Sequence, residues 1–212
     1  MMETCRLKFA LVVAVIALAS CKQAPQPASG DAKTATPANQ ASAPAHPVSG
    51  KKALWEVYKS AHGWAKDLAP LALASKSVPG IKNEGGNAVM WTATFGSPSK
   101  HEARIFTYSV ASHPPDIYKG VTIGNPIPWS GPTSTALPFA TSDDELVLDS
   151  DAAYKTAAEQ ATRWLKQHPD QELTISLGNS SRFPGAVWYL QWGDKKSGYA
   201  AYVNAKTGAI VK

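Results

Sequence analysis

Histidine, cysteine and acidic residues most often carry catalysis or hold metals, and this chain of 212 residues spaces them poorly for either task. Its histidines include no pair at i, i+3 or i+4 and no H-E-x-x-H motif, so a zinc hydrolase is not supported. Cys5 and Cys21 are the two cysteines, which excludes thiol catalysis in the rest of the chain. The sequence also holds no G-x-S-x-G, no P-loop and no dinucleotide fingerprint. The histidines are His46, His62, His101, His113 and His168.

Two short fragments match motifs of penicillin-recognising serine enzymes. Ser97-Pro98-Ser99-Lys100 fits S-x-x-K, and Lys206-Thr207-Gly208 fits K-T-G. In those enzymes the serine opens a helix, so that the lysine one turn later can take its proton. Pro98 and the strand-like flanks predict a hairpin turn instead, and the middle S-x-N element is absent between the two fragments. We therefore do not expect an enzyme of this class.

The acidic residues 143–145, together with Asp149 and Asp151, form the one acidic cluster of the sequence. Oxygen ligands at such spacing could hold Ca²⁺, but the glycine that an EF-hand loop needs at its bend is missing. The alternative is a solvated turn followed by Asp149 or Ser150 as the N-cap of a helix, with Asp151 in its first turn. The sequence thus predicts no metal site, no cofactor and no catalytic activity.

The first twenty residues predict a secretory signal peptide. Arg6 and Lys8 precede an apolar run of about a dozen residues, which is too short to span a bilayer as a helix. The run ends in Leu18-Ala19-Ser20-Cys21, which resembles the lipobox of bacterial lipoproteins. This resemblance implies cleavage before Cys21 and lipidation of its sulfur and new amine. Lys22 in place of aspartate favours the outer membrane, with the protein facing the periplasm.

Residues 21–50 predict a flexible linker that follows the lipidated cysteine. Prolines recur there among Ala, Ser, Thr, Gln and Gly, with no aromatic residue, and such a segment cannot bury enough apolar surface to become ordered. The rest of the chain contains every Trp and Tyr and is long enough for a stable core without disulfides. A net charge of +5 without a basic block argues against nucleic acid as a partner.

An internal repeat is the clearest pattern in the folded part. One apolar helical stripe, at i, i+4, i+7, i+10 and i+11, consists of Leu54, Tyr58, Ala61, Trp64 and Ala65. A hundred residues later the same spacing is filled by Tyr154, Ala158, Ala161, Trp164 and Leu165. Pro70 and Pro169 are expected to stop the two helices, and Trp64 and Trp164 are expected in the core.

Strand-like segments follow each predicted helix in the same order. They are 71–78, 88–95 and 103–110 in the first half, and 171–178, 186–192 and 199–203 in the second. Short turns between them predict antiparallel pairing, with a helix across one face of each sheet. The fold class is therefore α+β, with two tandem helix-plus-antiparallel-sheet units at 51–110 and 146–212 after a disordered tether. Whether the two units share one sheet is left open.

The second unit resembles a PepSY domain, a cystatin-like α+β module. The resemblance rests on 147–153, on the strand with Trp188 and Trp192, and on the ending 202–211 with its Thr207-Gly208 turn. Asn204 and Ala209 stand where that family has acidic residues. The resemblance implies a small, non-catalytic, extracytoplasmic module that holds or restrains partner proteins.

The connector at 111–145 is rich in proline and glycine and contains Trp129 and Phe139. If these aromatic residues are exposed, they are candidate anchors for a partner, since aromatic residues dominate interface hot spots. Alternatively, they fold back and cover the edge of the sheet.

In the second unit, Trp188 shares one strand face with Trp192, and Tyr189 occupies the other face. The sequence does not say which of the two faces is open to solvent.

These observations together predict a lipid-anchored envelope protein with a binding role. The favoured hypothesis is a non-catalytic protein-binding module that restrains or scaffolds an envelope protease or assembly factor, through an exposed sheet edge or the Trp129 loop. The alternative is a binding protein for a small molecule or a peptidoglycan fragment, with an aromatic-lined groove between the two units.

Overall fold

The structure is a computed structural model that describes residues 45–212. The predicted signal peptide, the lipidation site at Cys21 and most of the predicted linker lie outside the described residues. Neither helix within 45–212 combines the length and the apolar character that crossing a membrane requires.

The architecture is two helices packed on one antiparallel sheet, which confirms the predicted α+β class. The helices are α1 (Gly50–Trp64) and α2 (Ser150–Gln167). The strands of the first part are β1 (Ala69–Lys76), β2 (Met90–Ser97), β3 (Glu102–Ser109), β4 (Gly120–Ile123) and β5 (Ile127–Pro128). Those of the second part are β6 (Leu173–Asn179), β7 (Ala186–Trp192), β8 (Tyr199–Asn204) and β9 (Ile210–Val211).

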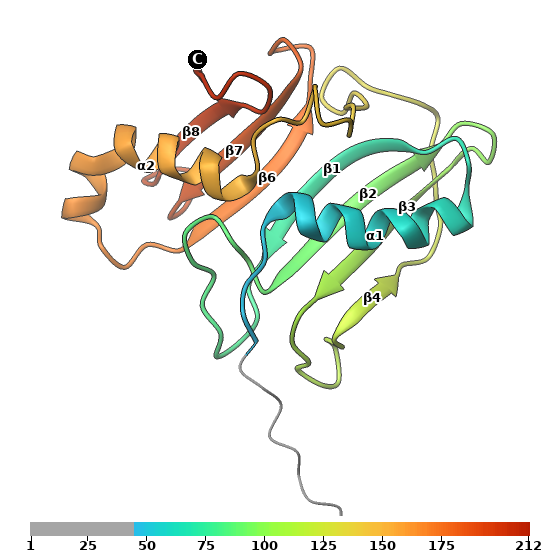
Figure 1. Cartoon of the computed structure of the whole chain (residues 1–212), viewed down its shortest axis with the longest axis horizontal. Helices are drawn as coiled ribbons and strands as arrows, with labels where there is room; N and C mark the ends of the chain where they lie inside the picture. The colour runs from blue at the N-terminus through green and yellow to red at the C-terminus, as the bar shows by residue number, and fades with distance from the viewer. Residues whose placement is uncertain (1–44) are drawn as a thin grey trace, which may run out of the picture. The chain divides into compact units, whose positions relative to one another are not determined.

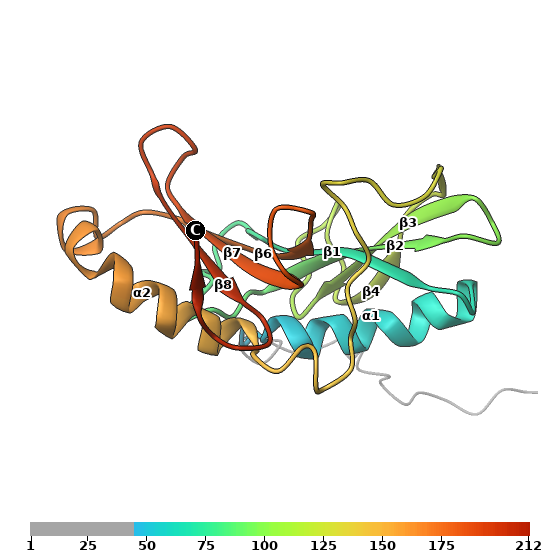
Figure 2. The same cartoon turned by 90° about the horizontal axis from the view of Figure 1, so that it is seen from above.

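All described strands join one sheet in the order β4-β3-β2-β1-β6-β7-β8-β9, and β5 pairs with β3. Figures 1 and 2 show both helices against the same face of this sheet. The two parts of the sheet meet where β1 pairs with β6, over only three residue pairs between Ala72–Ala74 and Ser176–Gly178. The question of a shared sheet is thus answered: β1 and β6 make it continuous.

The alternation of apolar residues along the strands explains which face the helices cover. Trp91 and Phe95 of β2 are buried beneath α1, and Trp188 and Trp192 of β7 are buried beneath α2. The rings of Trp91 and Trp188 meet edge to face, with centroids 6.5 Å apart, at the centre of the core.

Two details differ from the prediction: how deeply the helix tryptophans are buried, and where α1 ends. Trp64 and Trp164 are only partly buried and pack against the edge of the core. Helix α2 ends two residues before Pro169. Helix α1 ends earlier than predicted, because Ala65 takes an extended backbone that leads into β1, and Pro70 lies within that strand.

The ordered chain begins before the end of the predicted linker. Val48 exchanges two backbone hydrogen bonds with Ala88, of 3.0 and 2.9 Å, and Gly50 is buried as the first residue of α1. The side chain of Ser49 accepts a hydrogen bond from the Lys52 N–H and so caps α1. The linker prediction is therefore wrong for these last residues, because Val48 supplies a strand pairing and Ser49 a helix cap.

The connector adds two strands that the sequence does not predict. β4 and β5 both pair antiparallel with β3, whose outer edge would otherwise be free. Both ends of the sheet are short, since β4 has four residues and β9 has two. Pro126 precedes β5 and Pro128 lies within it. Because proline has no backbone N–H, these residues limit the addition of another strand at this edge. At the other end of the sheet, β9 pairs only with Tyr202 and Val203 of β8.

Candidate functional site

Both described helices lie on one face of the sheet, and the opposite face carries no helix in the described part of the chain (Figure 2). Directly paired residues of neighbouring strands lie on the same face, so the registers identify its side chains. One row of partners crosses the whole sheet, and it consists of Thr122, Thr107, Thr92, Ala74, Ser176, Tyr189, Tyr202 and Val211. We call this surface the open face.

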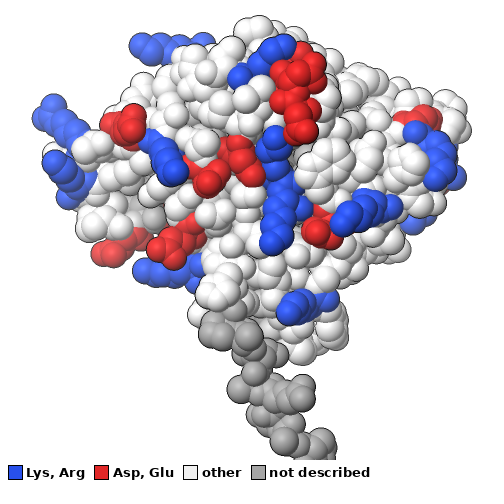
Figure 3. Space-filling model, viewed as in Figure 1, with Lys and Arg blue, Asp and Glu red and all other residues white. Residues whose placement is uncertain are grey.

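The strands contribute almost no charge to the open face. The described strands contain three charged residues, and two of them, Glu102 and Arg104, pair with Ser97 and Phe95 on the helix side. Only Lys76, the last residue of β1, lies on the open face among the strand residues that the structure describes. The helix side, in contrast, carries many lysine, arginine and acidic side chains (Figure 3). Depletion of charge is the composition expected at the centre of a protein interface.

Trp129 lies on the open face, at the β3 end of the sheet. A Cβ atom on Gly96 would come within 2.9 Å of three ring carbons of Trp129, so the indole covers this glycine. The backbone N–H of Trp129 donates to the carbonyl of His101 at 2.9 Å and holds the loop in place. Ile105 and Ile127, on the same face, are 43% and 49% exposed. This end of the open face is therefore an apolar patch with a half-buried tryptophan.

Phe139, the second predicted anchor, is not available to a partner. Its side chain is 4% exposed and belongs to the core, and its N–H donates to the carbonyl of Pro70 at 3.0 Å. The neighbouring Leu137 N–H donates to the carbonyl of Asn179 at the end of β6. Because β1 and β6 diverge beyond their three paired residues, Phe139 fills the gap between their ends. Phe139 is therefore part of the core and lacks the exposure that a partner anchor would need.

The other end of the open face carries a cluster of aromatic rings. The centroids of Tyr189 and Tyr202 lie 4.9 Å apart, and the Phe183 ring is 5.0 Å from that of Tyr202. The guanidinium of Arg182 lies over Phe183 and Tyr202, at 4.8 and 5.1 Å from their centroids. Burial, with a smaller effect of Tyr202, raises the pKa of Tyr189, so its hydroxyl stays neutral. The open face in this half is thus the side of Tyr189, while Trp188 faces the core.

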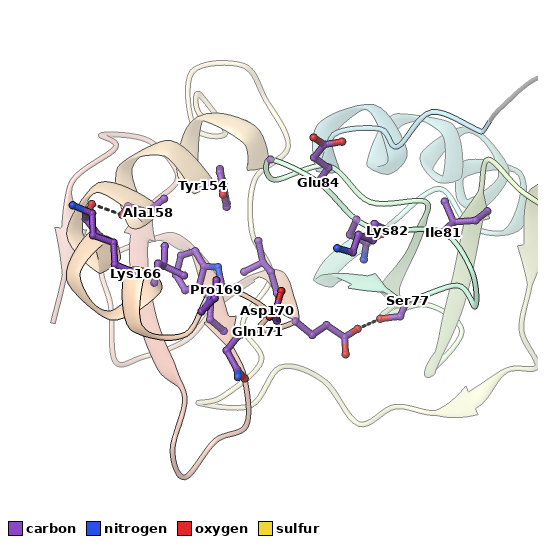
Figure 4. A pocket seen from close by; sticks show the side chains of 17 residues that line it. Ser77, Ile81, Lys82, Glu84, Tyr154, Ala158, Lys166, Pro169, Asp170 and Gln171 are labelled. Atoms are coloured by element: carbon purple, nitrogen blue, oxygen red, sulfur yellow. Dashed lines mark hydrogen bonds between the residues drawn. The ribbon is translucent and has the colours of Figure 1, made fainter.

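A groove on the helix side is the second candidate site. It has a volume of about 1110 Å³ and lies between α2 and the loop that joins β1 to β2 (Figure 4). It forms because β1 and β6 diverge after Ser75, whose hydroxyl accepts the N–H of Ile175 at 2.9 Å. Tyr154 and Trp192 line it, with ring centroids 6.2 Å apart.

The fragments that match serine-enzyme motifs are structural turns. Ser97 closes β2, and its hydroxyl donates to Asp67 Oδ1 at 2.7 Å, while the Ser99 N–H donates to Asp67 Oδ2 at 2.7 Å. These bonds lower the pKa of Asp67 to about 2. Asn204 Oδ1 accepts the N–H groups of Lys206 and Thr207 in the turn after β8.

The acidic cluster is engaged in ion pairs rather than gathered around a metal site. Lys51 reaches Asp143 at 3.3 Å, and Lys206 pairs with Glu145, a contact that raises the pKa of Lys206. Asp149 caps α2 through the Ser150 N–H, as predicted. Within residues 45–212, no three His, Asp or Glu side chains come together in a way that could hold a metal ion.

The comparisons with known proteins give little guidance. No protein-family model matches the chain, and no curated protein sequence matches it. A solved structure that resembles it is that of a "putative lipoprotein" from Clostridium difficile 630, with a TM-score of 0.49 and 10% sequence identity. The match covers 76% of this chain and 90% of the other. At this level of similarity the neighbour assigns neither a fold family nor a function to this chain.

Proposed function

We propose that this protein is a lipid-anchored envelope protein that binds a protein partner through the open face and carries out no catalysis. The observation that carries this proposal is the composition of the open face. Its strands hold one charged residue, a lysine near the margin. The exposed Ile105 and Ile127 lie beside Trp129 at one end, and the Tyr189–Tyr202 pair, with the guanidinium of Arg182 over Tyr202, lies at the other. Tyrosine, tryptophan and arginine are enriched in interface cores, and charged side chains are depleted there.

The lipid anchor is the sequence-based part of the proposal. Lipidation at Cys21 would tether the chain to the membrane, and Lys22 favours the outer membrane with the domain in the periplasm. The partner would be an envelope protease or an assembly factor that the open face restrains or scaffolds. A tethered binding module needs no active site of its own, which fits the structural use of Ser97, Asp67 and Lys206 described above.

We also propose that the domain consists of two tandem, PepSY-like units. Equivalent positions lie about a hundred residues apart and make the same contacts. The indole N–H of Trp91 donates to the carbonyl of Val48 at 2.9 Å, and that of Trp188 donates to the carbonyl of Leu148 at 3.0 Å. The alanines buried in α1 and α2 also correspond, namely Ala53 with Ala153 and Ala61 with Ala161.

Affinity capture after crosslinking in cells tests the proposal. The full lipidated chain would be compared with Thr107→Lys, which places a charge on the β3 part of the open face, and with Trp129→Ala. Gln160→Lys is the matched control, since this exposed residue lies on α2 and the variant adds the same charge. We expect one envelope protein to be recovered with the wild type and the control, and at least tenfold less with Thr107→Lys. Equal recovery with all variants, or none with the wild type, would reject the open face as the contact.

A second candidate function is binding of a small molecule or a peptidoglycan fragment in the groove between α2 and the β1–β2 loop. The observation that favours it is the size of this groove, about 1110 Å³, together with its aromatic lining. Ligand pockets usually have volumes of roughly 300–1,000 Å³ and place a few polar groups around an apolar wall. Titration of the full chain with such fragments tests this function independently of partner capture.

A further inference from the structure

Two direct contacts join the two halves of the chain beside the groove next to α2. In the first, a Cβ atom on Gly86 would lie 2.5 Å from the carbonyl oxygen of Ser150 and 2.6 Å from the Cα of Asp151, so the loop backbone touches the start of α2. In the second, the hydroxyl of Ser77 is hydrogen-bonded to Glu172. These contacts hold the β1–β2 loop against α2 and against the start of the second half of the sheet, and we call the groove that they flank the trough (Figure 4).

The walls of the trough combine apolar surface with charges of both signs. Apolar side chains come from Tyr154, Leu165 and Trp192, all of which pack on or belong to the core. Five charged residues also line the trough, namely Lys82, Glu84, Lys166, Asp170 and Glu172. None of the five takes part in an ion pair among the residues that the structure describes.

The position of these charges suits a ligand that carries charges of both signs. Lys82 and Glu84 belong to the β1–β2 loop, while Lys166 and Asp170 lie at the end of α2 and just after it, across the trough. Each wall thus offers one lysine and at least one carboxylate, since Glu172 lies on the same side as Asp170. A phosphate-rich ligand would be repelled by the three carboxylates, and an acyl chain would leave all five charges without a partner.

We propose that the trough binds short linear peptides with charges of both signs. This inference rests on the second candidate function and names its ligand class. The apolar wall with Tyr154 and Trp192 would hold an aliphatic or aromatic side chain of the peptide, while the lysines bind its carboxylates and Glu84 and Asp170 bind its ammonium groups. The volume of about 1110 Å³ exceeds that of a single amino acid and accommodates several residues.

Calorimetric titration of the full chain in detergent tests the inference. The probe is the peptide Ala-Lys-Leu-Glu with free termini, and the matched control probe is Ala-Gln-Leu-Gln with acetylated and amidated ends. We expect saturable binding of the charged probe, weaker binding at high salt, and no measurable binding of the neutral probe. Binding of both probes with equal affinity, or of neither, would overturn the proposed ligand class.

Three variants locate the binding site. Lys82→Ala and Lys166→Ala should each weaken binding of the charged probe about three- to fivefold, which is the factor expected for an exposed charge pair. Lys100→Ala, in the β2–β3 turn, is the control and should leave binding unchanged. Thr162→Trp should block the trough, while Gln160→Trp, on the exposed side of α2, should not. Unchanged binding by Thr162→Trp, in a variant with the wild-type circular dichroism spectrum, would exclude the trough as the site.

A peptidoglycan disaccharide-peptide serves as the last probe. If it binds and Thr162→Trp blocks it, while Ala-Lys-Leu-Glu does not bind, the ligand class proposed here is wrong and the second candidate function stands. If no probe binds and Thr162→Trp still captures the envelope partner, both the ligand class and the second candidate function fail, and binding through the open face is unaffected.

Discussion

The backbone N–H of Gly50 donates to the hydroxyl of Ser150 at 2.8 Å and thereby links the first residue of α1 to the first residue of α2. Next to this bond, Asp149 Oδ1 accepts the N–H groups of Lys51 and Ser150, at 2.8 and 2.7 Å. One carboxylate thus caps two helix N-termini, where the helix dipoles favour negative charge. This junction and the β1–β6 pairing hold the two halves of the domain together.

Ser150→Ala should destabilise the domain by about 1–3 kcal/mol, because it leaves the buried Gly50 N–H without an acceptor. Urea unfolding followed by tryptophan fluorescence would measure the free energy of unfolding. Ser60→Ala, in the middle of α1, is the control and should change it by less than about 0.5 kcal/mol. A loss below that value for Ser150→Ala would show that the junction contributes little.

Two glycines of α1 should respond to alanine in opposite ways. A Cβ atom on Gly50 would lie 2.6 Å from the Trp188 ring, and this ring is fully buried, so Gly50→Ala should cost about 1–3 kcal/mol through overpacking. A Cβ atom on Gly63 would meet nothing within 4 Å, so Gly63→Ala should stabilise the helix by up to about 1 kcal/mol. Thermal unfolding of the two variants would measure both effects. The same sign for both would contradict this packing.

Periodic apolar patterns allowed most of the fold to be predicted. Both helices and six strands follow from the spacing of residues such as Trp164 and Trp188, because one face of each element is buried. β4 and β5 could not be predicted, since they are short, contain proline or glycine, and depend on the free edge of β3 rather than on their own pattern.

The candidate sites were predicted less completely than the fold. Trp129 was identified by its type, but nothing in the sequence distinguishes its half-buried place over Gly96 from the core position of Phe139. That difference depends on how β1 and β6 diverge, which is a tertiary effect. The open face itself has a sequence signal that could have been used, since charges are nearly absent from the outward positions of every strand.

Acid should destabilise the domain partly through Asp67. Hydrogen bonds from Ser97 and Ser99 lower its pKa from 3.8 to about 2 in the folded state. Because the folded pKa is the lower one, the ionised carboxylate stabilises the fold above about pH 4, and this contribution is lost as the pH falls through 2. Asp67→Asn should therefore be less stable than the wild type at pH 7, by a margin that shrinks toward pH 2. The control is Asp116→Asn at an exposed loop position, and a pH-independent difference for Asp67→Asn would contradict the assignment.

Loss of the acylated cysteine should abolish lipidation. Cys21→Ala removes the sulfur that would be acylated, so intact-mass spectrometry should find no acyl mass on this variant. Cys5→Ala is the matched control, because that cysteine lies in the predicted signal peptide and should leave the acyl mass of the mature protein unchanged. A wild-type protein without acyl mass, or a Cys21→Ala protein with the wild-type acyl mass, would rule out lipidation at Cys21.

Site-specific photocrosslinking in living cells tests the central claim most directly. A benzoylphenylalanine residue would replace Thr92 or Tyr189 on the open face, or Lys59 and Gln160 on the exposed sides of α1 and α2 as controls. Binding through the open face predicts that both open-face positions form an adduct with the same envelope protein and that neither control does. Adducts only from the helix positions, or none from Thr92 and Tyr189, would contradict the proposal that the open face binds a partner.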